Sequence, residues 1–532
     1  MKQQSTGKGF AYLSIAELLV KIMSVVYMPL LVRILGDVGH GIYAVSYEAF
    51  TLIYVLTNEG IQRGISKLIS ELHAQGNPRD ALRAFRLSRT LLIGGGLFAS
   101  LLLFFMAPLI ASASSTPEAA LSIRFLAPTV LITAVLSAYR GYFLGRSYVS
   151  ANAISKILEQ LVNVVVSLSG AYFLMKIGVA LGVAGGTLGT SIGALVAVGL
   201  LVREFYKANL NRVRRNLQSA EAYHHTSREL VRKLLTYSFP ITLSAGMVNI
   251  GAFIDMFIVN NRLLAAGLIN TAAKTAFSEL TRFRNLLFVP NTIVVALAAV
   301  LLPGVAAANI VGDTDTVRRK INYSVKMVFM VTVPSFVGMT ILAGPIYDIL
   351  YPGKGGMELL RYGSITVIFL GFIQIQNVIF QGLGKFYWGV GTMFAGTVIK
   401  LIINYVLVGM PSVNIMGALV SNFANFFIPF LINHILITKV LKYDVKLMRN
   451  AAGPVISAVF MGVVIFVIGR IFSAFDAGYL VQSILTFVNI IIGTIVYMTS
   501  MLLTGGVTRK DLTEISPRLY GMLPKEIRRR MK

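Results

Sequence analysis

Cysteine is absent from this chain of 532 residues, which excludes disulfide bonds, thiolate metal sites and cysteine nucleophiles. Charged residues are also scarce, at 13% of the sequence. No Gly-x-x-x-x-Gly-Lys-Ser/Thr motif occurs, so the chain carries no sequence signal for ATP binding. A cleavable signal peptide is not indicated, because charges interrupt the first apolar segment and no small-residue cleavage site follows it. We therefore expect that segment to remain in the mature protein.

Apolar residues are abundant instead: they make up 56% of the chain, and the mean hydropathy is +0.74. A soluble domain of this size does not need so much apolar surface, so the composition predicts an all-α polytopic membrane protein. We interpret the charged stretch 262–284 as an extracytoplasmic amphipathic connection. A crossing needs about 20 apolar residues, and such segments predict fourteen transmembrane helices: 10–35, 41–62, 89–111, 121–144, 154–177, 181–203, 235–259, 285–309, 326–347, 362–383, 387–409, 414–438, 451–471 and 479–503.

The distribution of basic residues predicts the orientation of the chain. With the N-terminus inside, 36 of the 48 lysines and arginines fall in cytoplasmic segments and 9 in outer segments, a strong positive-inside signature. Both termini are then cytoplasmic. We interpret the net charge of +26 as orientation and attraction to anionic lipid, notably in segments 203–233 and 525–532, and not as nucleic-acid binding. His224 and His225 lack metal-ligand spacing and are expected in a solvated loop.

The first two predicted spans carry polar residues that a lipid-facing helix would exclude. Glu17 and Lys21 lie near the middle of the first span, where an ionisable group costs roughly 2.5–3.5 kcal/mol on the insertion scale. Alternatively, these two residues, four positions apart, neutralise each other as an intrahelical pair. The polar residues recur at helical spacing, so two matching stripes predict a solvated cavity: Ser14, Glu17, Lys21 and Ser24, then Glu48, Thr51, Asn58, Glu59 and Gln62.

An internal repeat relates residues about 230–240 positions apart. Because each copy has an even number of spans, the copies share one orientation and are related by an axis along the membrane normal. Glycines at 182, 186, 189 and 193 indicate close helix packing. Four matches support the repeat: the Leu-Gly-basic turns ending at Arg146 and Lys385, the later asparagines Asn163 and Asn404, the segments 186–190 and 417–421, and the loops 72–89 and 308–326.

The repeat predicts two pseudo-symmetric six-helix lobes plus two C-terminal helices. The expected domains are an N-lobe at 1–208, a basic linker at 209–233, a C-lobe at 234–440, the last two spans at 441–505 and a basic tail at 506–532. A cavity between two such lobes that opens alternately to either side is the arrangement of a transporter. Corresponding helices of the lobes hold most of the intramembrane charge, as expected for cavity-lining helices: Glu17, Lys21, Arg33, Glu48, Glu59, Asp255, Arg282 and Arg284.

Several motifs resemble the MOP superfamily, and most closely its polysaccharide-synthesis branch, which contains stage V sporulation protein B and the YtgP-type, MurJ-like lipid II flippases. The resemblance extends through Arg284 and the segment 301–303, so it covers most of the chain. Its most specific part is Gly-Ile-x-x-x-Ile-Ser-Lys at 60–67. The other motifs that carry it are Lys-Ile-Met-Ser-Val-Val-Tyr at 21–27, Pro29, Arg-Ile-Leu-Gly at 33–36 and Gly-Ile-Tyr at 41–43.

The resemblance implies a flippase, not an enzyme, that moves an undecaprenyl-pyrophosphate-linked oligosaccharide across the bacterial cytoplasmic membrane by alternating access. The oligosaccharide would be a lipid II-like precursor or a polysaccharide repeat unit. It implies a cationic central cavity, two extra C-terminal helices that form a groove for the lipid tail, and no cofactor or metal. The implied partners are the lipid-linked glycan, membrane lipids and enzymes of cell-wall or polysaccharide synthesis.

The same resemblance places functional residues. Lys21 and Arg284 match the family's basic residues that bind substrate, while Arg63, Glu17 and Glu48 are expected on the same cavity wall. Fixed cations in a low-dielectric cavity would replace the hydration of the pyrophosphate. Asp255 is the candidate for coupling to an ion or proton. The family's flippases of lipid II have basic residues where this chain has Tyr27, Ile53 and Tyr54, which leaves the glycan open.

Two other functions remain as alternatives on the sequence. A cation or drug antiporter of the MATE type shares the lobed repeat, but it has twelve spans and acidic coupling sites. A membrane polysaccharide polymerase would need a catalytic acid or base in a sizeable outer loop, where the stretch 260–284 offers only Glu279. The driving force, an ion gradient or the membrane potential, also stays open.

Overall fold

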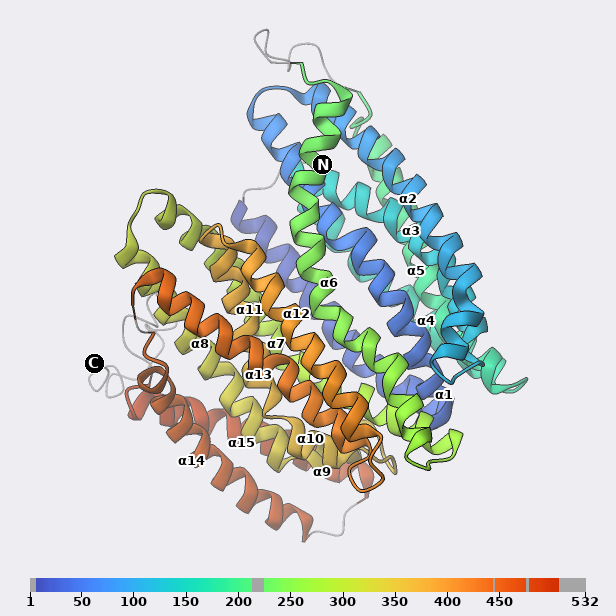
Figure 1. Ribbon diagram of the computed structural model, residues 1–532, viewed down its shortest axis with the longest axis vertical. Helices are drawn as coiled ribbons and strands as arrows, with labels where there is room; N and C mark the ends of the chain where they lie inside the picture. The colour runs from blue at the N-terminus through green and yellow to red at the C-terminus, as the bar shows by residue number, and fades with distance from the viewer. Residues whose placement is uncertain (1–5, 213–223, 444, 475–477, 507–532) are drawn as a thin grey trace. The chain divides into compact units, whose positions relative to one another are not determined.

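The computed structural model describes residues 6–212, 224–443, 445–474 and 478–506, and this part of the chain is built of helices (Figure 1). The predicted all-α membrane class is confirmed. Helices satisfy nearly all backbone N–H and C=O groups within the segment, as a bilayer requires. Prolines inside the helices, such as Pro108 and Pro128, each remove one of these hydrogen bonds. The predicted tail from 507 onward, linker residues 213–223, and the side chains of Ser14 and Glu59 lie outside the described part.

The helices follow one another with short connections. In the described residues they are α1 (Thr6–Ala74), α2 (Pro78–Ala113), α3 (Ala119–Gly145), α4 (Val149–Met175), α5 (Val179–Lys207), α6 (Ser227–Ala265), α7 (Asn270–Ile310), α8 (Thr314–Ile341), α9 (Ala343–Leu350), α10 (Met357–Gly363), α11 (Thr366–Gly382), α12 (Phe386–Ile403), the π-helix η2 (Asn404–Val408), α13 (Ile415–Leu441), α14 (Leu447–Ser473) and α15 (Tyr479–Leu503).

Eleven helices of the described chain are long and apolar enough to cross a membrane, or twelve if the bent pair α10–α11 forms one span. The longest, α1, consists of two helices that join at Gly36, whose backbone is not helical (φ 69°, ψ 178°). A straight helix of its 69 residues would be roughly 100 Å long, about three times the hydrocarbon thickness of a bilayer. Its two arms therefore match the first two predicted spans, while the total of fourteen stays a prediction.

The chain divides into two compact units, Met1–Ser278 and Glu279–Lys532. The helix α6 belongs to the first unit and packs against α1. The boundary expected at 234 between linker and C-lobe thus lies inside the first unit. The predicted domain ranges stay predictions.

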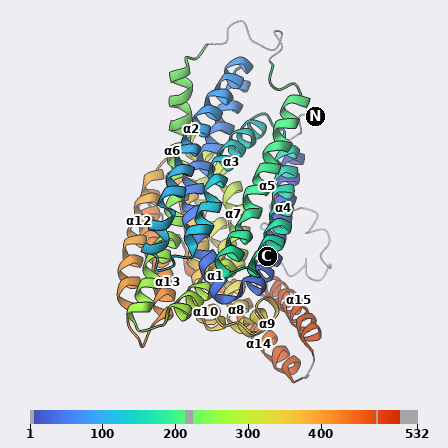
Figure 2. The ribbon, with the colours of Figure 1, turned by 90° about the vertical axis from the view of Figure 1, so that its right-hand side faces the viewer.

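The core of the first unit combines an aromatic cluster with close helix contacts. Phe85 of α2 packs against Tyr142 of α3 and Phe205 of α5, with ring centroids 4.5 and 5.2 Å apart. The helices α4 and α5 lie side by side (Figure 2) and approach through glycines. A Cβ at Gly185 would lie 2.4 Å from the carbonyl oxygen of Gly170, which is too close for any other residue. The glycine pattern of α5 thus serves close packing, as predicted.

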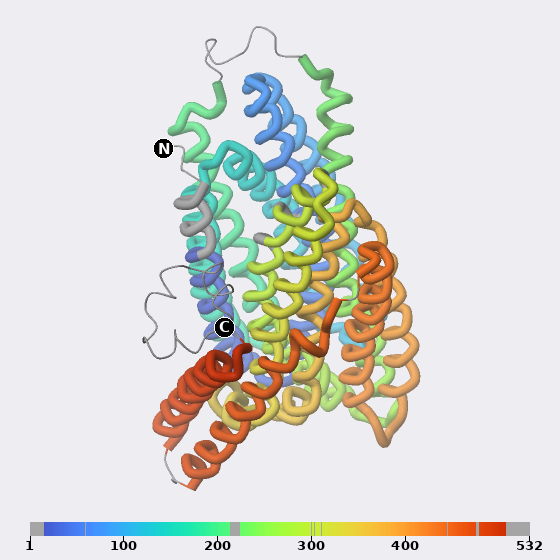
Figure 3. Tube along the Cα trace, turned by 90° about the vertical axis from the view of Figure 1, so that its left-hand side faces the viewer, coloured from blue at the N-terminus to red at the C-terminus, as the bar shows by residue number. Residues whose placement is uncertain are grey.

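The second unit pairs its last two helices and packs them on α8. The helices α14 and α15 run side by side (Figure 3). Their buried residues Met461, Ile465 and Tyr497 cluster with Val333 of α8. The Tyr497 hydroxyl donates to the carbonyl oxygen of Met330 at 3.0 Å.

Both units contain the same capped turn, at the loops that the repeat predicted. In the first unit Gly76 has a positive φ of 68°, and Asn77 Oδ1 accepts a hydrogen bond from the Asp80 amide at 3.2 Å. In the second unit Gly312 has a φ of 73°, and Asp313 Oδ1 accepts from the Thr316 amide at 2.9 Å. Each cap satisfies an N–H group at the start of a long helix.

The other matched turns agree in structure but shift the register. Ser147 (φ 61°) and Gly384 (φ 70°) occupy the left-handed position after α3 and α11, and the next amide donates five residues back at 2.8 Å in both turns. Ser147 is therefore equivalent to Gly384, whereas the Leu-Gly-basic match paired Gly145 with Gly384. The register from that motif was wrong by two residues.

A hydrogen bond between helices recurs at the matched asparagines. Thr190 of α5 donates to Asn163 Oδ1 of α4 at 3.4 Å. Ser421 of α13 donates to Asn404 Oδ1, at the start of η2, at 2.6 Å. The same polar contact thus joins the equivalent helix pair within each unit.

Candidate functional site

The first arm of α1 carries two of the predicted site residues, Glu17 and Lys21, one helical turn apart. Glu17 forms its ion pair with Lys156 of α4, and not the intrahelical pair with Lys21 considered from the sequence. Two turns further on, Gln160 of α4 donates to Ser24 Oγ at 3.3 Å. Lys21 itself is exposed. The polar stripe therefore lies against α4 at two levels and leaves the Lys21 ammonium at the surface of the unit.

The second arm of α1 carries Glu48, which is half-buried, and Arg63, which is exposed. At about 1.5 Å per residue, Lys21 lies roughly 22 Å from the bend at Gly36, Glu48 roughly 18 Å and Arg63 roughly 40 Å. Whatever the bend angle, the Cα atoms of Lys21 and Arg63 are then at least about 18 Å apart. Arg63 does not lie beside Lys21.

The remaining predicted residues lie on α6 and α7. Asp255 is fully buried in α6 of the first unit. Arg284 of α7 belongs to the second unit and is 8% exposed. A buried ionised group in a membrane protein is costly unless it has a partner. The presence of ionisable residues at these two positions therefore indicates a structural or functional role.

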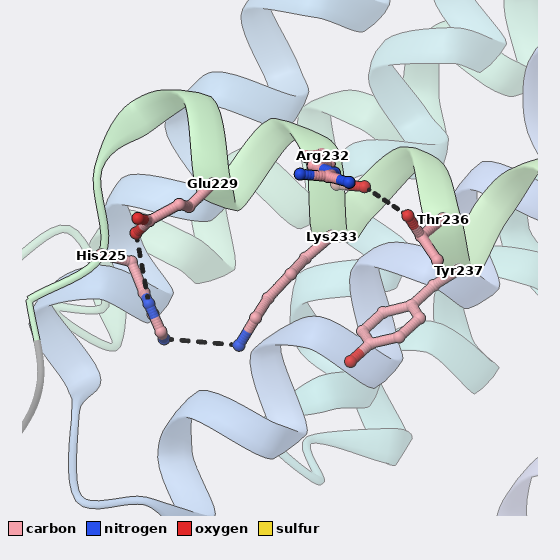
Figure 4. A pocket seen from close by; sticks show the side chains of 6 residues that line it. All are labelled: His225, Glu229, Arg232, Lys233, Thr236 and Tyr237. Atoms are coloured by element: carbon pink, nitrogen blue, oxygen red, sulfur yellow. Dashed lines mark hydrogen bonds and ion pairs between the residues drawn. The ribbon is translucent and has the colours of Figure 1, made fainter.

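One group of polar residues joins α1 to the first turns of α6; we call it the linker-end cluster (Lys67, Glu71, Lys233 and Tyr237). The Tyr237 hydroxyl donates to Glu71 Oε2 at 2.7 Å, and Lys233 Nζ donates to Glu71 Oε1 at 3.4 Å. The Lys67 ammonium lies 4.1 Å from the centroid of the Tyr237 ring. A cavity of about 410 Å³ borders Lys233 and Tyr237 (Figure 4).

The start of α6 is held to α2 as well. Asp80 Oδ2 accepts a hydrogen bond from the His225 amide at 2.7 Å, and Arg83 donates to Ser227 Oγ at 2.6 Å. The His225 ring lies 3.7 Å from Glu229 (Figure 4). Glu229 also forms a capping box with Thr226 at the start of α6. His225 is 12% exposed, so the expectation of a solvated loop was wrong for this residue.

A second group holds the start of α7, just after the turn that follows α6; we call it the turn-end cluster (His40, Glu118, Lys274 and Ser278). The buried Lys274 donates to Glu118 Oε1 at 2.7 Å, and the His40 ring contacts Ser278 Oγ at 2.8 Å. Partial burial alone would raise the pKa of Glu118, but the hydrogen bond and charge of Lys274 outweigh it and lower that pKa from its ordinary 4.5. The cluster therefore keeps Glu118 ionised at neutral pH.

Both clusters escaped the sequence reasoning for a physical reason. The bonded partners lie more than 150 positions apart, so no periodicity connects Glu71 with Tyr237 or Glu118 with Lys274. The partner of Glu17, Lys156, was the one that the sequence could have suggested. Lys156 and Gln160 are spaced by one helical turn in a predicted span and so form a polar stripe of their own. Within the described residues, no group of three or more His, Asp or Glu could hold a metal ion.

The model of the family described as "Polysaccharide biosynthesis protein" matches residues 6–309, more than half of the chain. The chain belongs to this family. Two relatives from Bacillus subtilis (strain 168) extend the match. "Lipid II flippase MurJ" is 21% identical over 515 residues, covering 92% of this chain and 94% of the relative. "Stage V sporulation protein B" is 25% identical over 454 residues, with 85% and 87% covered.

Solved structures of the MOP superfamily share the fold. An inward-facing multidrug resistance MATE family transporter superposes with a TM-score of 0.66 at 18% identity, covering 82% of this chain and 99% of that one. An inward closed conformation of lipid II flippase MurJ gives 0.63 at 15% identity, covering 92% and 97%. The chain is thus a multi-pass membrane transporter or flippase of the MOP superfamily and not a catalytic enzyme. The suspected superfamily is confirmed.

Proposed function

We propose that the protein is a flippase that translocates an undecaprenyl-pyrophosphate-linked oligosaccharide across the bacterial cytoplasmic membrane by alternating access. The observation that carries this proposal is the similarity to a lipid II flippase over 92% of the chain and 94% of that relative. The oligosaccharide is a lipid II-like peptidoglycan precursor or a polysaccharide repeat unit, and both termini are cytoplasmic. Enzymes of cell-wall or polysaccharide synthesis supply and consume it.

Lys21 and Arg284 bind the anionic headgroup in this proposal. The ion pair of Glu17 with Lys156 supports it, because Glu17 is then engaged elsewhere and leaves the neighbouring ammonium of Lys21 for a ligand. Pyrophosphate oxygens can accept charge-assisted hydrogen bonds from ammonium and guanidinium groups, which offset part of their lost hydration. Arg63, Glu17 and Glu48 orient the substrate or gate its passage, and Asp255 is the candidate coupling residue.

The linker-end and turn-end clusters are the two gates of the proposed cycle. The linker-end cluster fastens the start of α6 to α1, and the turn-end cluster fastens the start of α7 to the residue before α3. Alternating access requires these ends to separate in turn. The pair of Lys233 with Glu71 is about one-third exposed, and such pairs contribute only about 0–1 kcal/mol, so it can break and re-form during a cycle. The buried Lys274 costs more to separate from Glu118, unless water reaches it as that end opens.

A second candidate function, cation or drug antiport of the MATE type, is favoured by the TM-score of 0.66 to a MATE transporter. In that case Asp255 would exchange its proton or ion for a cationic substrate. The structural match covers 82% of this chain, against 92% for the flippase structure, so we rank it second.

A proteoliposome assay tests the proposal. Purified protein is reconstituted with defined undecaprenyl-pyrophosphate-linked glycans, and the fraction of each that reaches the outer leaflet is measured over time. We expect flipping of at least one glycan above the rate of protein-free liposomes, with no chemical change in the lipid. Failure with every glycan, together with efflux of cationic dyes driven by an ion gradient, would establish the antiporter instead.

A further inference from the structure

A cavity of about 480 Å³ lies at one end of the second unit, apart from every residue that the proposed flipping cycle uses. It is enclosed where α8 and α14 end and where α9 and α15 begin, so all four helices meet at the same membrane surface. The pair α14–α15 forms one side of this end of the unit (Figure 3). A volume of this size fits a small organic group and is far larger than a bare ion requires.

The polar side chains of this cavity share one property: each of six lining residues donates a hydrogen bond to a backbone carbonyl, at 2.8 to 3.4 Å. They are Ser473, Tyr479, Gln482, Ser483, Thr486 and Asn489. The single O–H donors of Ser473, Ser483 and Thr486 are thereby used and their oxygens can still accept, while each amide keeps a second N–H.

The lining of the cavity also carries a negative charge. Asp348 is an exposed carboxylate in the lining, which contains neither lysine nor arginine among the described residues. Deeper in the lining, Asn489 is 2% exposed, and its Oδ1 has no hydrogen-bond partner among the described atoms. A buried amide oxygen without a partner costs about 1–3 kcal/mol, so this end of the unit favours a ligand that brings donors. With one carboxylate and neither lysine nor arginine in the described lining, the cavity favours a cationic group over an anion.

The surroundings of the cavity indicate an amphipathic ligand. Beside the lining residues, α14 and α15 expose Ile471, Leu480 and Phe487, which are 53%, 71% and 57% exposed. Apolar side chains on a membrane helix that no protein covers are covered by lipid acyl chains. A molecule that reaches the cavity from this face therefore carries acyl chains and places its headgroup in the cavity.

We propose that this cavity binds the headgroup of a membrane phospholipid that ends in a primary ammonium, as in phosphatidylethanolamine, with Asp348 as the counter-ion of the ammonium. The three N–H bonds of the ammonium can be accepted by Asp348 and by the hydroxyl and amide oxygens of the lining, and the acyl chains lie along the exposed faces of α14 and α15. This inference rests on the second unit alone and does not depend on the identity of the flipped glycan.

The test compares three lipids on the full-length protein. The protein is equilibrated in mixed micelles with equal amounts of phosphatidylethanolamine, phosphatidylglycerol and phosphatidylcholine, and retained lipids are counted by native mass spectrometry. We expect preference for phosphatidylethanolamine, because phosphatidylglycerol is anionic and phosphatidylcholine has a cation without N–H donors. Equal retention of the three lipids would overturn the proposal.

Variants assign any preference to the cavity. Asp348→Asn should lower retention of phosphatidylethanolamine about tenfold, the size of one charge-assisted hydrogen bond. Thr486→Val removes one acceptor at nearly constant volume and should lower it to a smaller extent. Glu358→Gln is the matched control, because it removes an exposed carboxylate that pairs with Arg361 outside the cavity, and it should retain the lipid like the unaltered protein.

A final comparison separates a lipid from a soluble amine. Soluble glycerophosphoethanolamine should not displace the bound lipid at concentrations where added phosphatidylethanolamine does. Displacement by both at equal concentration would show that the cavity takes a soluble amine, and the lipid assignment would then be wrong. Unchanged lipid retention in Asp348→Asn would equally refute the assignment to this cavity.

Discussion

At the scale of single residues, Lys21 decides whether the flippase proposal holds. Replacing Lys21 or Arg284 by alanine should reduce flipping in proteoliposomes to background, because each removes a fixed positive charge expected to bind the pyrophosphate. Lys21→Arg keeps the charge and should retain measurable flipping. Lys176→Ala is the control: Lys176 lies 4.8 Å from the Tyr172 ring at the end of α4, and its loss should leave the rate unchanged.

The competing role of Lys21 is structural, as a partner of Glu17. If Lys21 served only as the partner of Glu17, the double change Glu17→Gln and Lys21→Gln would transport normally. The ion pair of Glu17 with Lys156 argues against that role. Full transport by that double variant would remove Lys21 from the binding site. Membrane insertion and the unfolding temperature, measured in parallel, distinguish a lost site from a lost fold.

At the scale of helices, the glycines of α5 allow a sharp comparison. A Cβ at Gly189 would lie 2.3 Å from the carbonyl oxygen of Asn163, whereas a Cβ at Gly199 would meet no atom within 4 Å. Gly189→Ala should destabilise the protein by about 1–3 kcal/mol, since α4 and α5 must separate. Gly199→Ala should be neutral or stabilise by up to about 1 kcal/mol. Thermal unfolding in detergent measures both, and equal midpoints would contradict the close packing of α4 on α5.

The contact between the end of α6 and the loop after α2, on the same side as the turn-end cluster, can be tested as a gate because the chain contains no cysteine. Ser115 donates a hydrogen bond to Asn261, so Ser115→Cys and Asn261→Cys together place two thiols in reach of each other. Oxidation of that double variant should stop flipping, and reduction should restore it, because a cross-linked turn end cannot open. Each single variant controls for the substitution itself. Undiminished flipping by the oxidised protein would show that this contact does not open during transport.

The helices could be predicted from the sequence, but the grouping of the helices into two compact units could not. Long apolar runs fixed nearly every span, because a bilayer leaves the backbone no alternative to a helix. Gly36 shows the limit of prediction from the sequence. It lies in the predicted connection between two spans, but the form of that connection, a bend within α1, is seen only from its φ of 69°. The placement of α6 in the first unit depends on contacts such as Glu71 with Tyr237, which join residues 166 positions apart and leave no trace in local sequence.

The candidate site shows the same division. A charge in an apolar span is readable because lipid penalises it, so Glu17, Lys21 and Asp255 could be found from the sequence alone. Their partners depend on which helices pack together. Lys156 lies near the start of the predicted span 154–177, and nothing in its local sequence shows that it forms the ion pair that engages Glu17.

At the scale of the whole molecule, the proposed flippase should use the membrane potential. An anionic headgroup that leaves an inside-negative cytoplasm moves down the field, at about 2.3 kcal/mol per net charge per 100 mV. If Lys21 and Arg284 give the empty site a net positive charge, the field also favours the return of that site to the cytoplasmic side. Flipping in liposomes should therefore accelerate when a potassium diffusion potential of the physiological sign is imposed, without a sodium or pH gradient. A rate indifferent to the sign of that potential would contradict this coupling and turn attention to Asp255.

The two capped turns, at 76–80 and at 312–316, bear on the evolutionary origin of the internal repeat. Left-handed glycines and Asx caps are common at helix ends, so neither alone indicates a common origin. Their recurrence at matched places of the internal repeat, together with the matched asparagine contacts, favours duplication of one ancestral segment. The divergence since then, with Glu159 in one half where the sequence repeat has Lys400 in the other, allowed each half to specialise.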